Sequence, residues 1–300
     1  MKHISITMNS ILTFRIADLP LQILSDYPKR TILQLLPSFA PFETDNVDVQ
    51  PLFQLAIGKK TPHLNTEFIH TFDTGNGYIS VAHIDCAGYQ FDIQNTHHHP
   101  CCLLQTDIPI THCRCALDGD LHTESFGLNT ALMLCFAFAS SKHKTLLIHA
   151  SAVRHQGRGF AFIAKSGTGK STHAAYWLKN IRDCDLLNDD NPVIRIISGE
   201  PYIFGSPWSG KTPCYRNIKV RLGAIAHIER SASNAIRQYA PAEAFAAFLP
   251  SCSAMKWDKV IYNSACNTIT EIIQTTDLYN LCCRPDDSAA RIAYQTIRKR

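Results

Sequence analysis

One stretch of the chain decides its fold: Phe160-Ala161-Phe162-Ile163-Ala164-Lys165-Ser166-Gly167-Thr168-Gly169-Lys170-Ser171-Thr172. Its first four residues are apolar and favour a strand, and the segment 171–179 after it has the composition of a helix. Between them lies the pattern of a phosphate-binding loop, or Walker A P-loop, although Ala164 stands where glycine is usual. The stretch therefore predicts a strand, loop and helix in which backbone N–H groups and a helix N-terminus converge on phosphates.

The loop residues divide the work of holding a triphosphate and its metal. We expect the nucleotide to contact Ser166-Gly167-Thr168-Gly169-Lys170-Ser171-Thr172. Gly167 and Gly169 allow a tight backbone whose N–H groups point at the phosphates. Lys170 can reach the β- and γ-phosphates, and Ser171 supplies a hydroxyl to Mg²⁺. ATP and Mg²⁺ are therefore the expected cofactors.

A pair of carboxylates, Asp189-Asp190, follows the apolar Leu186-Leu187 downstream of the loop. Adjacent carboxylates at a strand end can divide labour, one serving a metal and the other a nucleophile. Because Asn191-Pro192 comes next, the pair alone would be interpreted as a turn. A phosphate loop still needs a metal-binding carboxylate, so we interpret the pair as part of the same site.

Two further segments supply candidate catalytic residues. The turn-rich loop 205–216 carries Lys211 and Arg216, which we expect to stabilise charge on a transferring phosphoryl group or to hold an anionic substrate. A surface loop with Trp208 packed inward is the structural alternative. His149 stands near the end of a predicted strand, where a histidine is usually a hydrogen-bonded core or boundary residue.

The chain divides into three parts by its pattern. Residues 1–125 read as short β-segments separated by turns, which predicts a β-rich N-terminal domain of unknown role. Residues 126–144 begin with an apolar run without proline, and we expect a buried helix that joins the two halves. Residues 145–300 alternate strands, loops and helices, which predicts an α/β domain.

Composition excludes several classes of function. The 300 residues are 45% hydrophobic and 18% charged, as in ordinary globular proteins, and the net charge of +4 is scattered rather than gathered into a nucleic-acid patch. No segment approaches the roughly 18 uninterrupted apolar residues of a membrane helix. Without a recognisable targeting signal, we expect a cytoplasmic protein with reduced thiols and neither a membrane nor a nucleic acid as partner.

A histidine and cysteine tract spans residues 97–115. It contains His97-His98-His99-Pro100-Cys101-Cys102 and His112-Cys113-Arg114-Cys115, all residue types that ligate metals. The spacings fit no zinc pattern, and the triple histidine ends in proline as a turn does. We therefore assign no metal to this tract.

Several of these residues resemble a known family. Ile148-His149-Ala150, the glycine loop and Leu187-Asn188-Asp189-Asp190 are similar to the catalytic domain of HPr serine kinase/phosphorylase, over roughly residues 145–230. The inner loop is also similar to the nucleotide loop of ATP-dependent phosphoenolpyruvate carboxykinase, which shares this kinase core. The resemblance implies an α/β C-terminal domain with a phosphoenolpyruvate-carboxykinase-like P-loop kinase core, preceded by the β-rich N-terminal domain.

The resemblance also implies roles for individual residues. His149 and Asp189 would act together on the acceptor hydroxyl, with Asp189 as general base, while Ser171 and Asp190 would hold Mg²⁺ around ATP. A reverse reaction on phosphoserine and a tendency to form homo-oligomers are implied as well. The family's second signature is not recognisable here, and the first half does not match the family's N-terminal domain, so we do not expect HPr itself as the substrate.

The sequence thus leads us to expect an HPr kinase-like, ATP-dependent phosphotransferase that transfers the γ-phosphoryl group to a hydroxyl acceptor, foremost a serine of a protein or peptide. Two alternatives stay open. A small-molecule kinase or a carboxykinase-like enzyme would use Lys211 and Arg216 on an acidic substrate. A non-catalytic ATP-sensing protein would bind ATP tightly and act through residues 1 to about 140.

Overall fold

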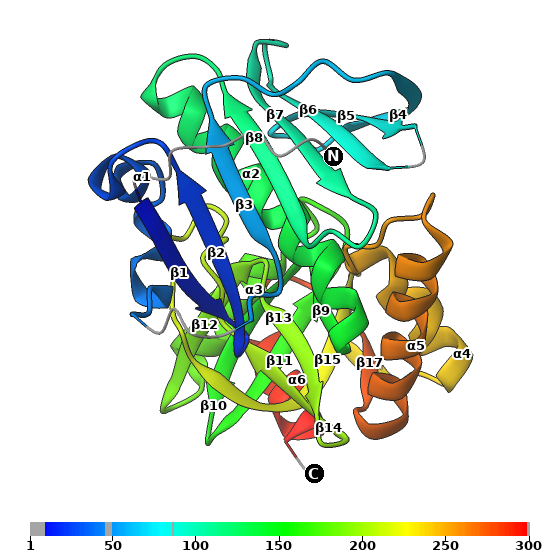
Figure 1. Ribbon diagram of the computed structural model, residues 1–300. Coiled ribbons are helices and arrows are strands. Elements are labelled where there is room, and N and C mark those ends of the chain that lie inside the picture. Colours follow the sequence, from blue (N-terminus) through cyan, green and yellow to red (C-terminus); the bar gives the residue numbers. More distant parts are fainter. Residues whose placement is uncertain (1–9, 46–49, 86, 299–300) are drawn as a thin grey trace. The chain divides into compact units, whose positions relative to one another are not determined.

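The computed structural model describes residues 10–45, 50–85 and 87–298. The chain divides into two compact units, residues 1–139 and 140–300, each built on its own sheet (Figure 1). The first sheet has eight strands and the second has nine. The protein is therefore of the mixed α/β class, which agrees with the sequence-based prediction at this level of detail.

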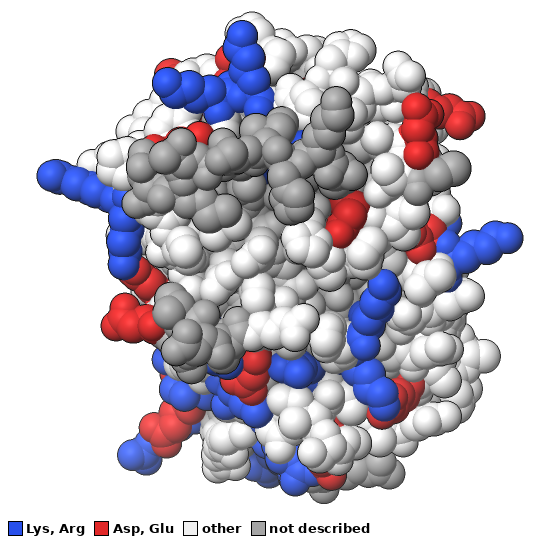
Figure 2. Space-filling model, in the orientation of Figure 1, with Lys and Arg blue, Asp and Glu red and all other residues white. Residues whose placement is uncertain are grey.

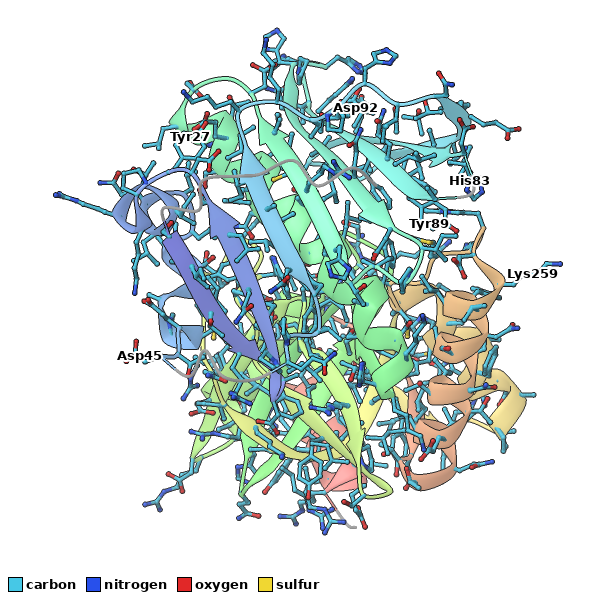
Figure 3. All side chains as sticks on the ribbon, viewed as in Figure 1. Tyr27, Asp45, His83, Tyr89, Asp92 and Lys259 are labelled. Atoms are coloured by element: carbon cyan, nitrogen blue, oxygen red, sulfur yellow. The ribbon has the colours of Figure 1, made fainter. Side chains whose placement is uncertain are left out.

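The first unit is an eight-stranded sheet with helices α1 (Lys29–Leu35) and α2 (Leu121–Ala139) and the 3-10 helix η1 (Pro37–Phe42). Its strand order is β1-β2-β3-β8-β7-β6-β5-β4. The strands are β1 (Ser10–Ile16), β2 (Leu19–Ser25), β3 (Gln54–Gly58), β4 (Thr66–Asp73), β5 (Gly77–Ile84), β6 (Gly88–Asn95), β7 (Pro100–Asp107) and β8 (His112–Leu117). Figure 3 shows the register of β5 and β6 at His83 and Tyr89, whose ring centroids are 4.9 Å apart.

Helix α2 packs against β6, β7 and β8 of the first unit. It begins five residues before the expected position because Asp120 caps it, accepting a hydrogen bond from the N–H of Thr123 at 2.9 Å. A Cβ on Gly127 would stand 2.5 Å from the backbone oxygen of Cys101, so glycine lets the helix approach β7 closely. The helix ends at Ala139, and the 3-10 helix η2 (Ser140–His143) follows it in the second unit.

The histidine and cysteine tract forms a turn and two strands of the first unit. The side chain of Asn95 accepts hydrogen bonds from the N–H groups of His97 and His99, and the ring of His98 stacks on Tyr78 at 4.0 Å. Burial raises the pKa of the Cys135 thiol on α2 well above its usual value. The cysteines within the described ranges are all free, and no three or more His, Cys, Asp or Glu side chains there are grouped to hold a metal ion.

The second unit is a nine-stranded sheet with the strand order β12-β10-β11-β15-β14-β13-β9, and β17 also pairs with β15 and β16. Its strands are β9 (Thr145–Leu147), β10 (Ala150–His155), β11 (Arg158–Ile163), β12 (Cys184–Asp190), β13 (Val193–Ile197), β14 (Glu200–Phe204), β15 (Lys219–Arg230), β16 (Ala235–Gln238) and β17 (Leu278–Cys283). Strand β15 runs parallel to β11 and β17, whereas the other pairs are antiparallel.

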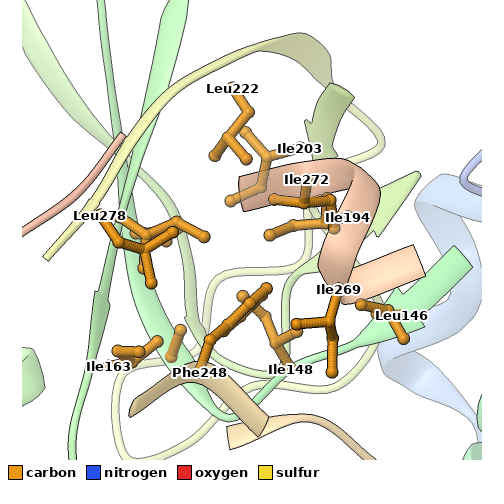
Figure 4. Packing of buried hydrophobic residues seen from close by; sticks show 14 of the residues in the cluster. Leu146, Ile148, Ile163, Ile194, Ile203, Leu222, Phe248, Ile269, Ile272 and Leu278 are labelled. Carbon is orange, nitrogen blue, oxygen red and sulfur yellow. The ribbon is translucent and has the colours of Figure 1, made fainter. Parts of the chain in front are cut away.

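Both faces of this sheet are covered. Along β11, Phe160 and Phe162 pack toward α3 (Lys170–Asn180) and α6 (Asp287–Ile297), whereas Ala161 and Ile163 pack toward α4 (Pro241–Phe248) and α5 (Lys259–Thr275). This alternation follows from the two-residue period of a strand. Figure 4 shows the cluster on the side of α4 and α5, to which Phe248, Ile269 and the strand residue Ile163 belong. The 3-10 helix η3 (Leu249–Ser251) follows α4.

Charged side chains are dispersed over the surface. On the face drawn in Figure 2, lysine and arginine side chains are interspersed with acidic ones and with uncharged residues. Within the described ranges, no helix combines the length and the apolar character that crossing a membrane requires.

His173 of α3 is a buried histidine of this fold. Its ring meets Phe162 edge-on at 4.7 Å, and its Nε2 accepts a hydrogen bond from the indole N–H of Trp177 at 3.0 Å. Burial lowers the pKa of His173 from 6.5 to about 4. The neutral ring is therefore part of the packing, and protonation opposes folding.

We expect His173 to make stability depend on pH. Between pH 7 and pH 5 the unfolded histidine binds a proton and the folded one does not, so this residue should lower the free energy of unfolding by about 2 kcal/mol. In His173→Gln, the decrease in the free energy of unfolding that His173 causes between pH 7 and pH 5 should be absent. The control His122→Gln, at an exposed histidine, should show the same decrease as the unaltered protein. Urea unfolding followed by tryptophan fluorescence measures this, since Trp177, Trp208 and Trp257 all lie in the second unit. An unchanged pH dependence in His173→Gln would contradict the assignment.

Candidate functional site

Three strand ends meet at one edge of the second sheet. Ala150, the first residue of β10, pairs with Ile163 at the end of β11 and with Asp190 at the end of β12. Because β10 is antiparallel to both neighbours, β11 and β12 run in the same direction and finish at the same edge. The register therefore brings together His149, the glycine loop and the Asp189-Asp190 pair, which are far apart in the sequence.

The glycine loop leaves β11 after Ile163 and enters α3 at Lys170. Gly167 has a φ of 75° and Gly169 a φ of 128°, conformations that residues with side chains rarely adopt. A Cβ at either position would meet nothing within 4 Å, so the backbone conformation and not crowding requires glycine. No described side chain caps α3 at Gly169, which leaves the first N–H groups of the helix for a ligand.

The hydroxyl-bearing residues of the loop face solvent. Ser166, Ser171 and Thr172 are exposed, and their hydroxyls bond to no other residue in the described part of the chain. The loop itself is held by Arg230 at the end of β15, whose Nε donates to the carbonyl oxygen of Thr168 at 3.0 Å and whose NH2 donates to that of Gly167. The sequence analysis missed Arg230, the last residue of β15.

Lys170, His149 and Asp190 form a connected chain of polar contacts. The ammonium Nζ of Lys170 lies 2.6 Å from His149 Nε2 and 3.3 Å from the carbonyl oxygen of Ala164. On the other side of the ring, His149 Nδ1 lies 3.2 Å from Asp190 Oδ1. Burial lowers the pKa of His149, the Lys170 charge lowers it further, and Asp190 opposes both. In a neutral ring Nε2 accepts from the Lys170 ammonium, so Nδ1 carries the proton and lies at ion-pair distance from the Asp190 carboxylate.

The surroundings of Lys170 act on the pKa of its ammonium group in opposite directions. The residue is 8% exposed, and burial lowers the pKa of its ammonium group, while the charges of Asp190 and Asp189 act in the opposite direction. Its charge is thus directed at the two carboxylates and is available to a further anion placed beside the loop.

The two aspartates have different environments. Asp189 is 2% exposed, and neither of its carboxylate oxygens has a hydrogen-bond partner among the described residues. Asp190 has a φ of 140°, a conformation that residues with side chains rarely adopt, and its carboxylate contacts His149. The structure thus pairs His149 with Asp190, whereas the family resemblance implies a pair of His149 with Asp189.

Loop 205–216 lies against the end of β12 and is organised by Asn188. The buried amide of Asn188 contacts the carbonyl oxygen of Trp208 at 3.0 Å and those of Ser206 and Cys214 at 3.4 Å each. In addition, the N–H of Gly210 in this loop donates a hydrogen bond to the carbonyl oxygen of Asp189. Trp208 is buried. Asn188, which the sequence analysis did not single out, therefore fixes the loop beside the carboxylates.

The structure does not bring Lys211 and Arg216 to the same place. Arg216 pairs with Asp185 at 3.0 Å and also donates to the carbonyl of Leu186. Asp185 lies five residues before Asp190, roughly 16 Å along an extended strand, and it also pairs with Arg154. Lys211 is exposed, follows Gly210 at the carboxylates, and has no partner in the described part of the chain. Arg216 thus anchors the loop, whereas Lys211 is an exposed cation next in the chain to Gly210.

Comparisons with known proteins give a distant likeness. No protein-family model matches the chain, and no curated protein matches it. Among solved structures, the HPr(Ser) kinase/phosphatase from Coxiella burnetii is similar to this chain at a TM-score of 0.30 and 10% sequence identity. The similarity covers 51% of this chain and 93% of that chain. A TM-score this low shows no more than a remote resemblance in shape.

We expect Asn188→Ala to loosen loop 205–216. The substitution leaves several buried carbonyl groups with one donor fewer, which should weaken the closed loop by about 1–3 kcal/mol. Trypsin should then cut after Lys211 about tenfold faster or more, because local opening exposes the bond. Asn267→Ala, at an exposed asparagine of α5, is the matched control. Equal cleavage rates in the two variants would mean that Asn188 does not hold the loop.

Proposed function

We propose that the second unit transfers the γ-phosphoryl group of ATP to a hydroxyl group, and that the acceptor is a serine of a protein or peptide. The observation that carries this proposal is the convergence of the glycine loop, the Lys170, His149 and Asp190 contacts, and the unpartnered carboxylate of Asp189 at one sheet edge. Phosphoryl transfer requires mainly positioning and charge neutralisation, which these groups supply.

The loop and α3 would hold the phosphates. Backbone N–H groups at Gly167 and Gly169 and the uncapped start of α3 supply neutral donors. Lys170 would exchange its contact with His149 for the β- and γ-phosphates, where its charge is more strongly neutralised. Arg230 would keep the loop carbonyls turned away from the phosphates, since it already occupies those of Gly167 and Thr168.

The residues present fit Mg²⁺. Asp189 offers two buried oxygens without a partner, a costly arrangement for a carboxylate unless a cation compensates it. Ser171 offers a free hydroxyl at the start of α3. Magnesium in such sites is commonly held by one or two protein groups together with the substrate phosphates. When bound, it neutralises charge on the β- and γ-phosphates.

His149 and Asp190 would handle the acceptor's proton. Burial and the Lys170 charge lower the pKa of His149, which favours the neutral ring, and its Nδ1 lies 3.2 Å from Asp190 Oδ1. Once Lys170 turns to the phosphates, Nε2 becomes free to accept the proton of the attacking hydroxyl. Asp190 then stabilises the charged ring. In this assignment Asp190 acts with His149, and Asp189 serves the metal.

The acceptor side of the site is open. The side chains of His149 and Asp190 are 42% and 31% exposed, and Lys211, which follows Gly210, is exposed and has no partner in the described part of the chain. An exposed attacking face accommodates a residue that belongs to a larger molecule, and Lys211 suits an acceptor with negative charge nearby. This openness favours a protein or peptide serine over a small molecule.

We expect Lys170→Ala to abolish transfer from γ-labelled ATP. With Mg²⁺ and lysate of the native host, the unaltered protein should label a protein or peptide serine that mass spectrometry identifies. The variant should label it about 100-fold less or lower still, because one preorganised cationic donor is lost. Lys259→Ala, at an exposed lysine of α5, should behave as the unaltered protein. Label confined to a small molecule would indicate a metabolite kinase, and ATP binding without transfer would indicate a sensor.

We expect the two aspartates to differ when each is changed. Asp190→Asn should leave the ATP dissociation constant unchanged and reduce transfer about 100-fold, because the proton-accepting pair is lost. Asp189→Asn should raise the Mg²⁺ concentration needed for half-maximal ATP binding about tenfold, because a metal ligand is lost. Titrations of ATP at several Mg²⁺ concentrations measure ATP binding in both variants, and the assay with γ-labelled ATP measures transfer. The reverse pattern would restore the assignment that the family resemblance implies.

A further inference from the structure

A second concave site lies in the same unit, at the far end of α3. Helix α3 begins at Lys170 beside the glycine loop and ends at Asn180, roughly 16 Å away at 1.5 Å per residue. At that end is a pocket of about 420 Å³, formed by the β10–β11 turn, the end of α3 and one side of α6. None of its lining residues belongs to the candidate site described above.

The pocket is rich in arginine. Arg182, Arg291 and Arg298 line it, and Asp183 is its one acidic lining residue. Arg182 and Asp183 are both highly exposed and 3.7 Å apart, so their pairing is weak. Neither Arg291 nor Arg298 forms an ion pair with a carboxylate in the described part of the chain. Arg291 interacts electrostatically with Asp287, one helical turn before it, but in the described part of the chain neither guanidinium group forms a close ion pair.

Neutral groups hold these two arginines in place. Arg291 donates to the side-chain oxygen of Asn180 at 3.1 Å. Arg298 lies over the ring of Tyr294 at 4.9 Å from its centroid and donates to the Tyr294 hydroxyl at 3.5 Å. A guanidinium has five N–H donors, so most donors of both residues remain for a ligand.

The wall behind the arginines is ordered by aromatic packing. Tyr294 meets Trp177 edge-on at 5.7 Å, and its hydroxyl lies 3.0 Å from Nε2 of His155, which is 6% exposed. These contacts restrict the rotation of the Tyr294 side chain. Because the Arg298 guanidinium packs on the Tyr294 ring, its position is restricted as well. Preorganised donors lose less entropy on binding than mobile ones.

A simpler explanation for arginines at this place is the negative end of a helix dipole. Cations that serve this purpose contact the carbonyl groups of the last turn. Here Arg291 bonds to the side chain of Asn180 and Arg298 to that of Tyr294. Neither side chain hydrogen-bonds to a last-turn carbonyl in the described part of the chain, so their donors remain available to a ligand.

We propose that this pocket binds a small phosphate monoester. Such an ester carries close to two negative charges at neutral pH, which matches the excess of two positive charges among the lining residues. Planar guanidinium groups bind phosphate oxygens in pairs. The volume lies in the range of sites for small metabolites, and it is larger than a lone phosphate needs.

Calorimetric titration of glycerol 3-phosphate tests this proposal, and inorganic phosphate serves as a second probe. The Lys170→Ala background weakens binding at the glycine loop and isolates the pocket. We expect binding of glycerol 3-phosphate that weakens at least tenfold in Arg291→Gln/Arg298→Gln and is unchanged in Lys259→Gln. Glycerol with sodium chloride at equal ionic strength should give no heat. No binding of glycerol 3-phosphate, or equal binding in the double variant, would overturn the proposal.

Amide chemical shifts of the otherwise unaltered protein provide a test without pocket variants. Glycerol 3-phosphate should shift the side-chain amides of Gln156 and Gln295, which line the pocket, and the indole of Trp177 behind it. Shifts confined to residues 166–172 would place the ligand at the glycine loop and would overturn the proposal. Neither measurement depends on kinase activity, so the result stands apart from the proposed function.

Discussion

Strand β11 is buried on both faces, and this constraint organises the second unit. Its alternating residues must find apolar partners on two sides, which requires helices above and below the sheet. A strand so enclosed can expose functional groups only where it ends. The glycine loop follows at that end, with β10 starting and β12 finishing beside it. The site is therefore a consequence of packing before any chemistry is considered.

The charged groups at this edge of the sheet are buried to different extents, and this determines how they interact. Lys170 and His149 lie close together, and each is disfavoured in its charged form by its surroundings, so the contact is tolerable only with a neutral ring and a charged ammonium. The Asp190 carboxylate lies 3.2 Å from that ring, whereas the side-chain oxygens of Asp189 have no hydrogen-bond partner among the described residues. Two adjacent residues of the same type thus have different environments, because the Asp190 carboxylate lies beside a histidine, whereas that of Asp189 is buried without a hydrogen-bond partner among the described residues.

Local patterns in the sequence predicted the loop, the helix after it and the carboxylate pair, because each is a short motif with its own backbone requirement. Partners contributed by other strands were not predictable in this way. Arg230 of β15 hydrogen-bonds to the glycine loop, and Arg216 forms an ion pair with Asp185. His149 lies beside Asp190, whereas the sequence analysis paired it with Asp189. These pairings depend on strand register, which a single sequence does not encode locally. The start of α2 was missed for a smaller reason, since Asp120 was not recognised as its cap.

The backbone conformation of Asp190 favours glycine, whereas the proposed chemistry requires the carboxylate at this position. Its φ of 140° costs a residue with a side chain about 1–3 kcal/mol, and glycine would remove most of that strain. Glycine would also delete the carboxylate that contacts His149. A library screened for thermal tolerance alone should thus drift toward glycine at this position and discard the site while improving the fold. For the function proposed above, residue 190 therefore has to stay aspartate, although glycine would relieve the backbone strain there.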